Sequence, residues 1–309
     1  MDQVLPYVLL FLVSLVVLLK SSDFFIEAAE KIGLSLGISP FIIGVTIVAF
    51  GTSLPELATS LASVFSGESE IVVGNVVGSN ITNIALVLGL VAVIGKQIEL
   101  PYNVWHIDMP FLWGSAFLLW LTLQDGAFGL HEALLFVAGI VLFLSYSFKA
   151  DKVDESDRPV VAVKTYLILI AGGIGVWLGA DYTIKAVSHL STLAGISPEV
   201  IALTVIAFGT SLPEVIVSIS AVRRGQASIA IGNVLGSNIF NTYIVMSIPS
   251  FFGTLVIPPI VMTTSIPIMI ILTILFGVIT NNRKITRWEG FLLLMFYAFF
   301  VMDSLKNVL

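Results

Sequence analysis

The segment AFGTSLPE occupies residues 49–56 and returns at residues 207–214. Around it, residues 37–83 align without a gap onto residues 195–241, because each residue is matched by the one 158 positions later (207 − 49 = 158). In this alignment 26 of the 47 positions are identical, and the shared residues are mainly Gly, Pro, Ser, Thr, Asn and Glu. Polar residues are costly in an apolar segment, so their retention in both copies indicates a shared chemical role rather than duplication for stability alone.

The composition around these repeats indicates that lipid is the main solvent of the chain. Of the 309 residues, 57% are hydrophobic and only 11% are charged, whereas a soluble domain has about 25% charged residues. A membrane-spanning helix needs about 20 apolar residues, which leaves room for about ten such helices. The chain has no cysteine, so the sequence excludes disulfides and thiolate metal sites.

Apolar stretches punctuated by Gly, Pro and charged residues predict ten transmembrane helices, near residues 3–27, 38–64, 71–95, 104–123, 131–149, 162–188, 196–222, 229–252, 259–280 and 287–305. A polar linker at 149–160 separates a first five-helix half, 1–148, from a second, 161–309. Five helices separate the repeats at 37–83 and 195–241, so the second copy crosses the membrane in the opposite direction. The predicted fold class is an all-α integral membrane protein made of two inverted five-helix repeats, an architecture of many secondary transporters.

The basic residues orient these predicted helices. With the N-terminus outside, 12 of the 14 Lys and Arg residues fall on the cytoplasmic side, which is a strong positive-inside bias. We therefore expect an integral membrane protein with its N- and C-termini outside. The N-terminal MDQVLPYVLL lacks the basic region of a cleavable signal peptide and is interpreted as part of the first helix.

Each repeat places one acidic residue, Glu56 or Glu214, near the middle of an apolar helix. A charge there costs at least about 2.5 kcal/mol, so these residues are functional candidates. Pro55 has no N–H to donate to the carbonyl of Gly51, so the helix should break and release carbonyl oxygens, with Ala49 among them. The second repeat has the same Pro and Gly. Carboxylate, carbonyl and hydroxyl oxygens are hard ligands that suit calcium and sodium rather than zinc or copper.

A second motif in each repeat supplies further oxygen atoms. It reads GNVVGSNITN at residues 74–83 and returns as GNVLGSNIFN in the second repeat. Its glycines at GxxxG spacing are expected to let helices approach closely. Asn83 and Asn241 are candidates for the ion site, whereas for Asn80 and Asn238 both ion binding and capping of a neighbouring broken helix remain open.

At these residues the chain resembles the sodium/calcium exchanger family of the calcium/cation antiporter superfamily. The likeness spans nearly the whole chain and includes both copies of GTSLPE and of GN-x-x-GSN-x-x-N. It implies an antiporter that exchanges three sodium ions for one calcium ion and moves its first and sixth helices as a sliding gate. It also implies a set of metal ligands: Glu56, Glu214, Asn83, Asn241, Thr52, Thr210, Ser53, Ser211, Ser79, Ser237, and the carbonyls of Ala49 and Ala207.

One residue separates this chain from part of that family. The potassium-dependent branch and some prokaryotic relatives carry Asp at the position of Asn241, and the Asn found here argues against potassium co-transport. The same Glu pair would also suit a calcium/proton antiporter, which is the alternative. A passive channel would not need two neutralisable carboxylates beside broken helices, and the sequence lacks the GxGD and GxSG motifs of membrane-embedded hydrolases.

The expected protein is therefore a secondary active transporter and not an enzyme. It is expected to use no cofactor, and calcium and sodium are its transported ions. Membrane lipid is its predicted surrounding. Neither a nucleic acid nor an obligatory protein partner is indicated by the sequence.

Overall fold

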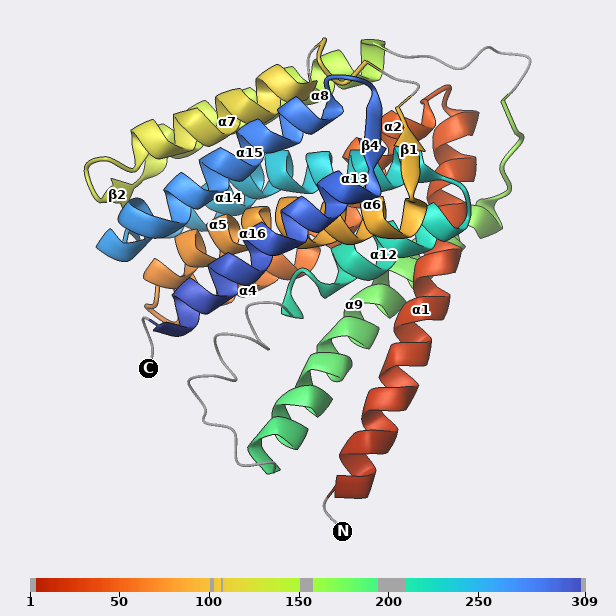
Figure 1. The fold of residues 1–309 in the computed structure, drawn as a ribbon, viewed down its shortest axis with the longest axis horizontal. Helices are drawn as coiled ribbons and strands as arrows, with labels where there is room; N and C mark the ends of the chain where they lie inside the picture. Colours follow the sequence, from red (N-terminus) through yellow and green to blue (C-terminus); the bar gives the residue numbers. More distant parts are fainter. Residues whose placement is uncertain (1–3, 101–102, 107, 151–157, 194–208, 307–309) are drawn as a thin grey trace.

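The structure is a computed structural model that describes residues 4–100, 103–106, 108–150, 158–193 and 209–306. Most of these residues are helical (Figure 1). The helical segments, with π-helical turns marked η, are α1 (Val4–Ser35), α2 (Pro40–Ile43), η1 (Gly44–Val48), α3 (Ala49–Thr52), α4 (Leu54–Phe65), α5 (Glu70–Thr82), η2 (Asn83–Leu88), α6 (Gly89–Gly95), α7 (Asp108–Thr122), α8 (Leu130–Ala150), α9 (Val163–Leu193), α12 (Leu212–Arg223), α13 (Ala227–Phe240), η5 (Asn241–Val245), α14 (Met246–Ser250), η6 (Val261–Ser265), α15 (Ile266–Thr280) and α16 (Arg287–Lys306). The short strands β1 (Gln97–Glu99) and β4 (Lys284–Thr286) pair antiparallel, as do β2 (Ala127–Phe128) and β3 (Leu255–Val256).

Eight helices in the described part of the chain are long and apolar enough to cross a membrane. The other two predicted spans, near 104–123 and 196–222, correspond to α7, which has 15 residues, and to α12, which follows residues outside the description. The all-α membrane fold is thus confirmed, while the count of ten spans and the inverted orientation of the repeats stay predictions. The proposed linker at 149–160 also falls largely outside the described residues.

The first helix is longer than the sequence predicts. It continues to Ser35 instead of ending near residue 27. Lys31 lies on the exposed face of this extension, where its Nζ forms an ion pair of 2.7 Å with Oε1 of Glu27 one turn earlier. The opposite face buries Ala29 and Ile32. An amphipathic helical turn therefore extends α1 beyond its uniformly apolar stretch.

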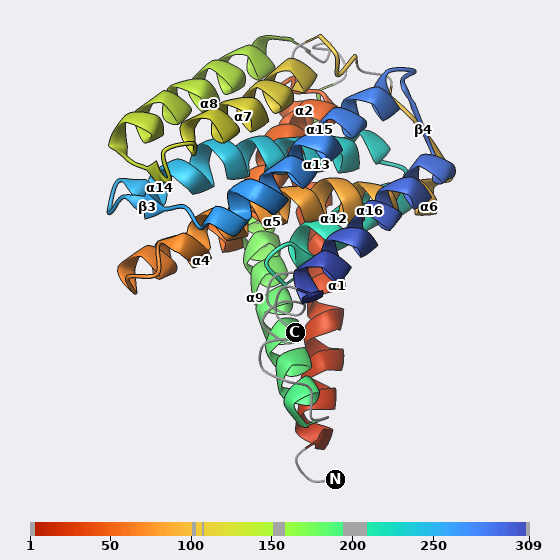
Figure 2. The ribbon, with the colours of Figure 1, turned by 60° about the vertical axis from the view of Figure 1, so that its left-hand side comes forward.

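Helices α1 and α9 form a long antiparallel pair that is inclined to the remaining helices (Figures 1 and 2). Small residues on α9 let the two backbones approach closely. A Cβ added to Gly179 would lie 2.8 Å from the Cα of Leu18. Near the N-terminus of α1, Thr183 Oγ1 donates a hydrogen bond of 2.9 Å to Ser14 Oγ. These contacts make α1 and α9 one packed unit.

Polar contacts fasten the end of this pair to the second repeat. The hydroxyl oxygens of Ser22 on α1 and Ser220 on α12 lie 2.9 Å apart and are buried. Just beyond α12, Arg224 Nη2 lies 3.2 Å from Glu27 Oε2. An exposed ion pair of this kind contributes about 1 kcal/mol or less, so it positions α1 without locking it.

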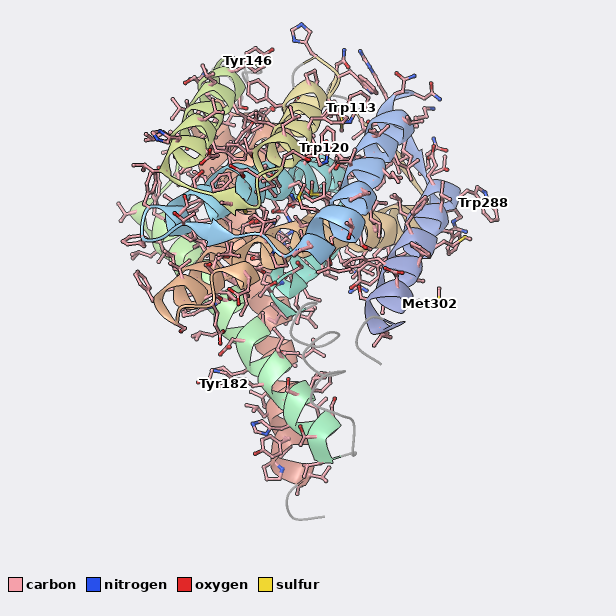
Figure 3. All side chains as sticks on the ribbon, turned by 90° about the vertical axis from the view of Figure 1, so that its left-hand side faces the viewer. Trp113, Trp120, Tyr146, Tyr182, Trp288 and Met302 are labelled. Carbon is pink, nitrogen blue, oxygen red and sulfur yellow. The ribbon has the colours of Figure 1, made fainter. Side chains whose placement is uncertain are left out.

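The remaining helices form a block with α13 at its centre. The 18-residue apolar window of Ala227–Ser250 is 89% buried, whereas the corresponding windows of α1 and α16 are 11% buried. Figure 3 shows Trp288 and Met302 pointing outward from α16, and these side chains are 75% and 56% exposed. Exposed apolar side chains on the outer helices are what a lipid-facing surface requires.

Candidate ion-binding site

The first repeat carries a helix break at the predicted position. Helix α3 ends at Thr52 and α4 begins at Leu54, and Ser53 between them has φ −87° and ψ 5°, outside regular α-helix geometry. Pro55 accounts for the break because it has no N–H to continue the hydrogen-bond ladder. The expected release of the Ala49 carbonyl is wrong, since this oxygen accepts the Ser53 N–H at 3.0 Å. The same oxygen also lies within hydrogen-bond distance of Thr52 Oγ1.

The second repeat has the same local geometry. Ser211 precedes α12 with φ −85° and ψ 4°, and Pro213 follows within the first turn of that helix. Two segments 158 residues apart thus adopt one backbone conformation at the same motif position (211 − 53 = 158). Ala207, the predicted carbonyl ligand of this repeat, lies outside the described residues.

The two carboxylates meet through crossed hydrogen bonds. Ser53 Oγ of the first repeat donates to Glu214 Oε1 at 3.2 Å, and Ser211 Oγ of the second donates to Glu56 Oε1 at 3.5 Å. Both Glu side chains are fully buried. The Oε2 atom of each has no hydrogen-bond partner in the described part of the chain. The predicted pairing of the carboxylates in one site is therefore supported, with one acceptor oxygen of each left for a cation.

Buried amides add to this set of unsatisfied groups. Asn83 and Asn241 are fully buried, and neither the nitrogen nor the oxygen of either amide has a partner among the described residues. Each begins a π-helical turn, η2 or η5, and such turns recur at functional sites. A buried polar group without a partner costs about 1–3 kcal/mol, so these amides indicate a place that a polar ligand fills.

The predicted hydroxyl ligands lie in the same region. Ser79 and Ser237 are buried on α5 and α13, and Thr52 is buried at the end of α3. Thr52 Oγ1 lies 3.3 Å from the Ala49 carbonyl oxygen and 3.4 Å from Ser237 Oγ. Residues of both repeats are thus brought together around the first break.

Asn80 and Asn238 of the same motif have hydrogen-bond partners of their own. Asn80 Nδ2 donates to Thr242 Oγ1 at 3.0 Å, and Asn238 Nδ2 donates to the Val234 carbonyl of its own helix at 2.6 Å. Neither contact caps the breaks at Ser53 or Ser211. The Oδ1 atoms of both residues are buried without a hydrogen-bond partner in the described part of the chain, so ion binding by Asn80 and Asn238 stays open.

Sequence reasoning missed a further pair, Asn75 and Asn233. Asn75 Nδ2 donates a hydrogen bond of 3.0 Å to the backbone carbonyl of Glu56 on α4. Asn233 Oδ1 accepts a hydrogen bond of 3.1 Å from Thr52 Oγ1 of the opposite repeat. Asn75 and Asn233 match each other in the aligned repeats, so their identity was a signal that could have pointed to them.

The arrangement suits a hard cation. In the described part of the chain no three His, Cys, Asp or Glu side chains cluster to hold a metal. The site thus offers two carboxylates and otherwise neutral oxygen atoms. Calcium takes six to eight oxygen ligands at about 2.3–2.6 Å, and sodium also favours such hard oxygens.

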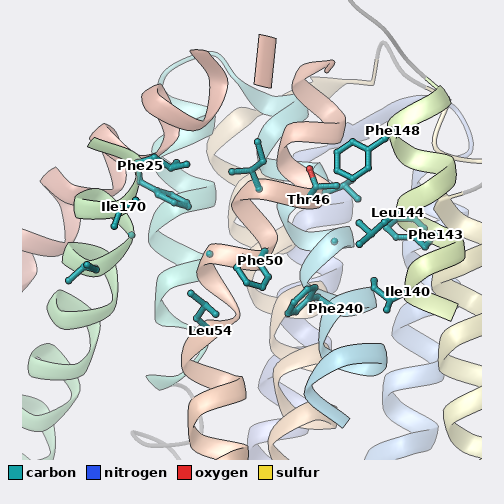
Figure 4. Close-up of a pocket in the computed structure, with 17 residues that line it drawn as sticks. Phe25, Thr46, Phe50, Leu54, Ile140, Phe143, Leu144, Phe148, Ile170 and Phe240 are labelled. Carbon is teal, nitrogen blue, oxygen red and sulfur yellow. The ribbon is translucent and has the colours of Figure 1, made fainter. Parts of the chain in front are cut away.

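Among the pockets that adjoin the broken helices, two differ in their chemistry. The larger one, about 480 Å³, lies between η1, α3, α8 and α9, and its labelled side chains are apolar apart from Thr46 (Figure 4). The other, about 290 Å³, reaches Pro55, Thr210 and Pro213 at the two breaks and Asp181 on α9. A hydrated cation would need polar groups along its route, so of these two pockets the second is the one suited to admit ions.

Comparison with known proteins agrees with this geometry. A family model described as sodium/calcium exchanger protein matches residues 6–149 and 164–305. The chain is 32% identical, in an alignment 340 positions long, to the sodium/calcium exchanger MaX1 of Methanosarcina acetivorans, and the alignment covers 95% of this chain and 97% of that protein. It is 31% identical to the inner membrane protein YrbG of Escherichia coli, with 94% of each chain covered.

A solved structure has the same fold. The chain superposes on the sodium–calcium exchanger NCX_Mj, soaked without sodium or calcium, with a TM-score of 0.86 and 31% sequence identity. The match covers 97% of this chain and 99% of that one. The fold and the paired acidic site therefore define an integral membrane ion transporter. The chain belongs to the sodium/calcium exchanger protein family.

Proposed function

We propose that this protein exchanges sodium for calcium across a prokaryotic cell membrane, binding both ions at the site between the two helix breaks. The observation that carries the proposal is the crossed pairing of Ser53 with Glu214 and Ser211 with Glu56. It joins the acidic residues of the two repeats into one buried site. The unpartnered amides of Asn83 and Asn241 supply neutral oxygen atoms beside it.

Charge explains why such a site would exchange ions instead of leaking them. Two ionised carboxylates give the empty site a charge of about −2, which is costly to expose in a low-dielectric path. One calcium ion neutralises it. If three sodium ions replace one calcium ion, each cycle moves one net positive charge and is electrogenic. Crossing of the empty site is disfavoured, so net movement of one ion requires countermovement of the other.

Access would alternate by movement of α1 and α9. Helices α1 and α9 pack chiefly against each other, which suits a unit that slides as one body past the site. The pocket that contains Pro55, Pro213 and Asp181 would be the aqueous route on one side. With the predicted ten spans, both termini lie outside. We propose no cofactor and no obligatory protein partner, so the machinery consists of the two five-helix halves in lipid.

The decisive experiment is calcium-45 uptake into proteoliposomes made with purified protein. We expect uptake that depends on an outward sodium gradient and that generates a membrane potential. A calcium/proton antiporter, the second candidate, uses the same carboxylates. Calcium uptake that follows a pH gradient and ignores sodium would establish that candidate in place of the first.

Transport is expected to be independent of potassium. Asn241 provides a neutral amide where the potassium-dependent branch has Asp, so the site has two negative charges and lacks the third that an additional cation would need. The measurement compares sodium-driven calcium uptake with potassium or choline as the background cation. The two rates should agree, and uptake that stops on withdrawal of potassium would contradict the assignment. Asn241→Asp tests the same point by adding the missing charge.

A further inference from the structure

Asn75 and Asn233 occupy matching positions and make matching contacts across the two repeats. Asn233 is fully buried on α13, where its Nδ2 donates to Ser218 Oγ at 2.9 Å and its Oδ1 accepts from Thr52 Oγ1 at 3.1 Å. Asn75 on α5 donates from Nδ2 to Ser60 Oγ at 2.9 Å, and its Oδ1 lies 3.5 Å from Thr210 Oγ1. Each amide thus connects the helix that carries the Glu of its own repeat, α4 or α12, to a threonine of the other repeat.

For Asn75 the direction of the hydrogen bonds follows from chemistry. The backbone carbonyl of Glu56 can only accept, so the group of Asn75 that lies 3.0 Å from it must be the NH₂. The carbonyl oxygen of that amide is therefore the atom that faces Thr210. Asn233 contacts a hydroxyl on each side, and its match to Asn75 assigns the oxygen to Thr52 and the NH₂ to Ser218.

This direction determines how the threonine hydroxyls can act. A hydroxyl has one proton and two lone pairs, and it binds a cation only when its proton points away from that cation. The proton of Thr52 has two acceptors other than a hydroxyl within reach, the Ala49 carbonyl and Asn233 Oδ1. The Ala49 carbonyl oxygen already accepts the Ser53 N–H at 3.0 Å, and the contact of Thr52 Oγ1 with Asn233 Oδ1 is the shorter of the two, 3.1 Å against 3.3 Å. Asn233 Oδ1 then takes the proton and leaves the lone pairs of Thr52 for the ion.

We propose that Asn233 and Asn75 are positioning residues that orient the hydroxyls of Thr52 and Thr210 toward bound cations without touching the ions themselves. The proposal rests on the proposed ion site and deepens it. Sodium should depend on this orientation more than calcium, because a monovalent ion gains less from the two carboxylates and relies more on neutral oxygen atoms.

The test is a pair of double-mutant cycles on purified protein, read by calorimetric calcium binding and by sodium competition. We expect Asn233→Ala to weaken apparent sodium affinity about tenfold, the size of one lost hydrogen bond, and calcium affinity about threefold. In a Thr52→Val background the same change should have almost no further effect, because the hydroxyl that it orients is already gone. Asn75→Ala combined with Thr52→Val should instead give the product of the two single effects.

Several outcomes would overturn the proposal. One is a multiplicative loss for Asn233→Ala with Thr52→Val, and another is an unchanged affinity in Asn233→Ala alone. Ser218→Ala is the matched control, since it removes a contact of the same amide but keeps Oδ1, and it should change sodium affinity less than Asn233→Ala. If Asn233→Ala does not fold, the cycle of Asn75→Ala with Thr210→Val decides, because Asn75 is less buried.

These outcomes separate the proposal from the proposed function. Failure of sodium/calcium exchange would appear as wild-type protein without sodium-driven calcium uptake, or without sodium competition. The calcium-binding cycles would still report whether Asn233 acts through Thr52. An additive result in protein that exchanges normally would reject the positioning role alone.

Discussion

Replacing either Glu56 or Glu214 with Gln should abolish sodium-driven calcium uptake while leaving a folded protein. Gln keeps the size of the side chain and an acceptor oxygen, so Ser53 and Ser211 can still donate across the repeats. One negative charge is lost, however. The site with calcium bound then carries a net positive charge in a low-dielectric surrounding. Loss of one partner of a buried charge interaction costs about 3–5 kcal/mol, so calcium affinity should fall by at least about a hundredfold.

The measurement is calcium-45 uptake by each purified, monodisperse variant, with calcium binding by calorimetry alongside it. Asn83→Ala and Asn241→Ala serve as comparison variants, and they should weaken transport less because water can replace a neutral ligand. Near-normal uptake in either Glu variant would remove that residue from the ion site. Because the repeats pair one Glu with the other, neither residue should compensate for loss of its counterpart.

The second large effect is expected at Gly236, where α13 crosses η1. A Cβ at this position would lie 2.2 Å from the carbonyl oxygen of Val45, and one at Gly232 would lie 2.3 Å from that of Phe41. These are backbone atoms and cannot swing aside as a side chain can. Gly236→Ala should therefore push α13 off η1 and lower stability by about 3 kcal/mol or more. Ser237 and Asn233 share this helix, so calcium binding should weaken as well.

Thermal unfolding of the detergent-purified protein measures this effect. Gly114→Ala on α7 is the matched control, since a Cβ there meets no described atom within 4 Å. Ala exceeds Gly in helix propensity by about 1 kcal/mol, so the control should be neutral or slightly stabilised. An unfolding temperature for Gly236→Ala equal to that of the control would show that α13 and η1 can separate without cost.

Much of this architecture could be predicted because its causes are local. Pro55 breaks its helix through the absence of one N–H, whatever surrounds it, and Ser211 before Pro213 has the same backbone angles as Ser53. The boundaries of most spans follow from apolar stretches, and the predicted span near 71–95 corresponds to Glu70–Gly95. Helix α1 ended later than predicted because its last turns are amphipathic, with Ile32 buried and Lys31 exposed.

The glycine motifs show what a local pattern cannot predict, which is the packing partner of a helix. The sequence predicted close packing at the GxxxG spacing in both repeats. In the second repeat it is confirmed, with Gly232 and Gly236 against the backbones of α2 and η1. For Gly74 and Gly78 no described atom lies within 4 Å of an added Cβ, so that part remains a prediction. Spacing identifies a surface that permits close approach, but it does not identify the partner.

The sequence by itself determined that the chain is a membrane protein, that one acidic motif occurs in two copies, and where the helix of the first copy breaks. These follow from composition, from identity between the repeats, and from the missing N–H of proline. Only the tertiary structure decided that Ser53 serves Glu214 and Ser211 serves Glu56, over separations of 161 and 155 residues. It likewise decided that Asn233 reaches Thr52 across the repeats. Such contacts depend on the register in which distant helices pack, and no local pattern in the chain records that register.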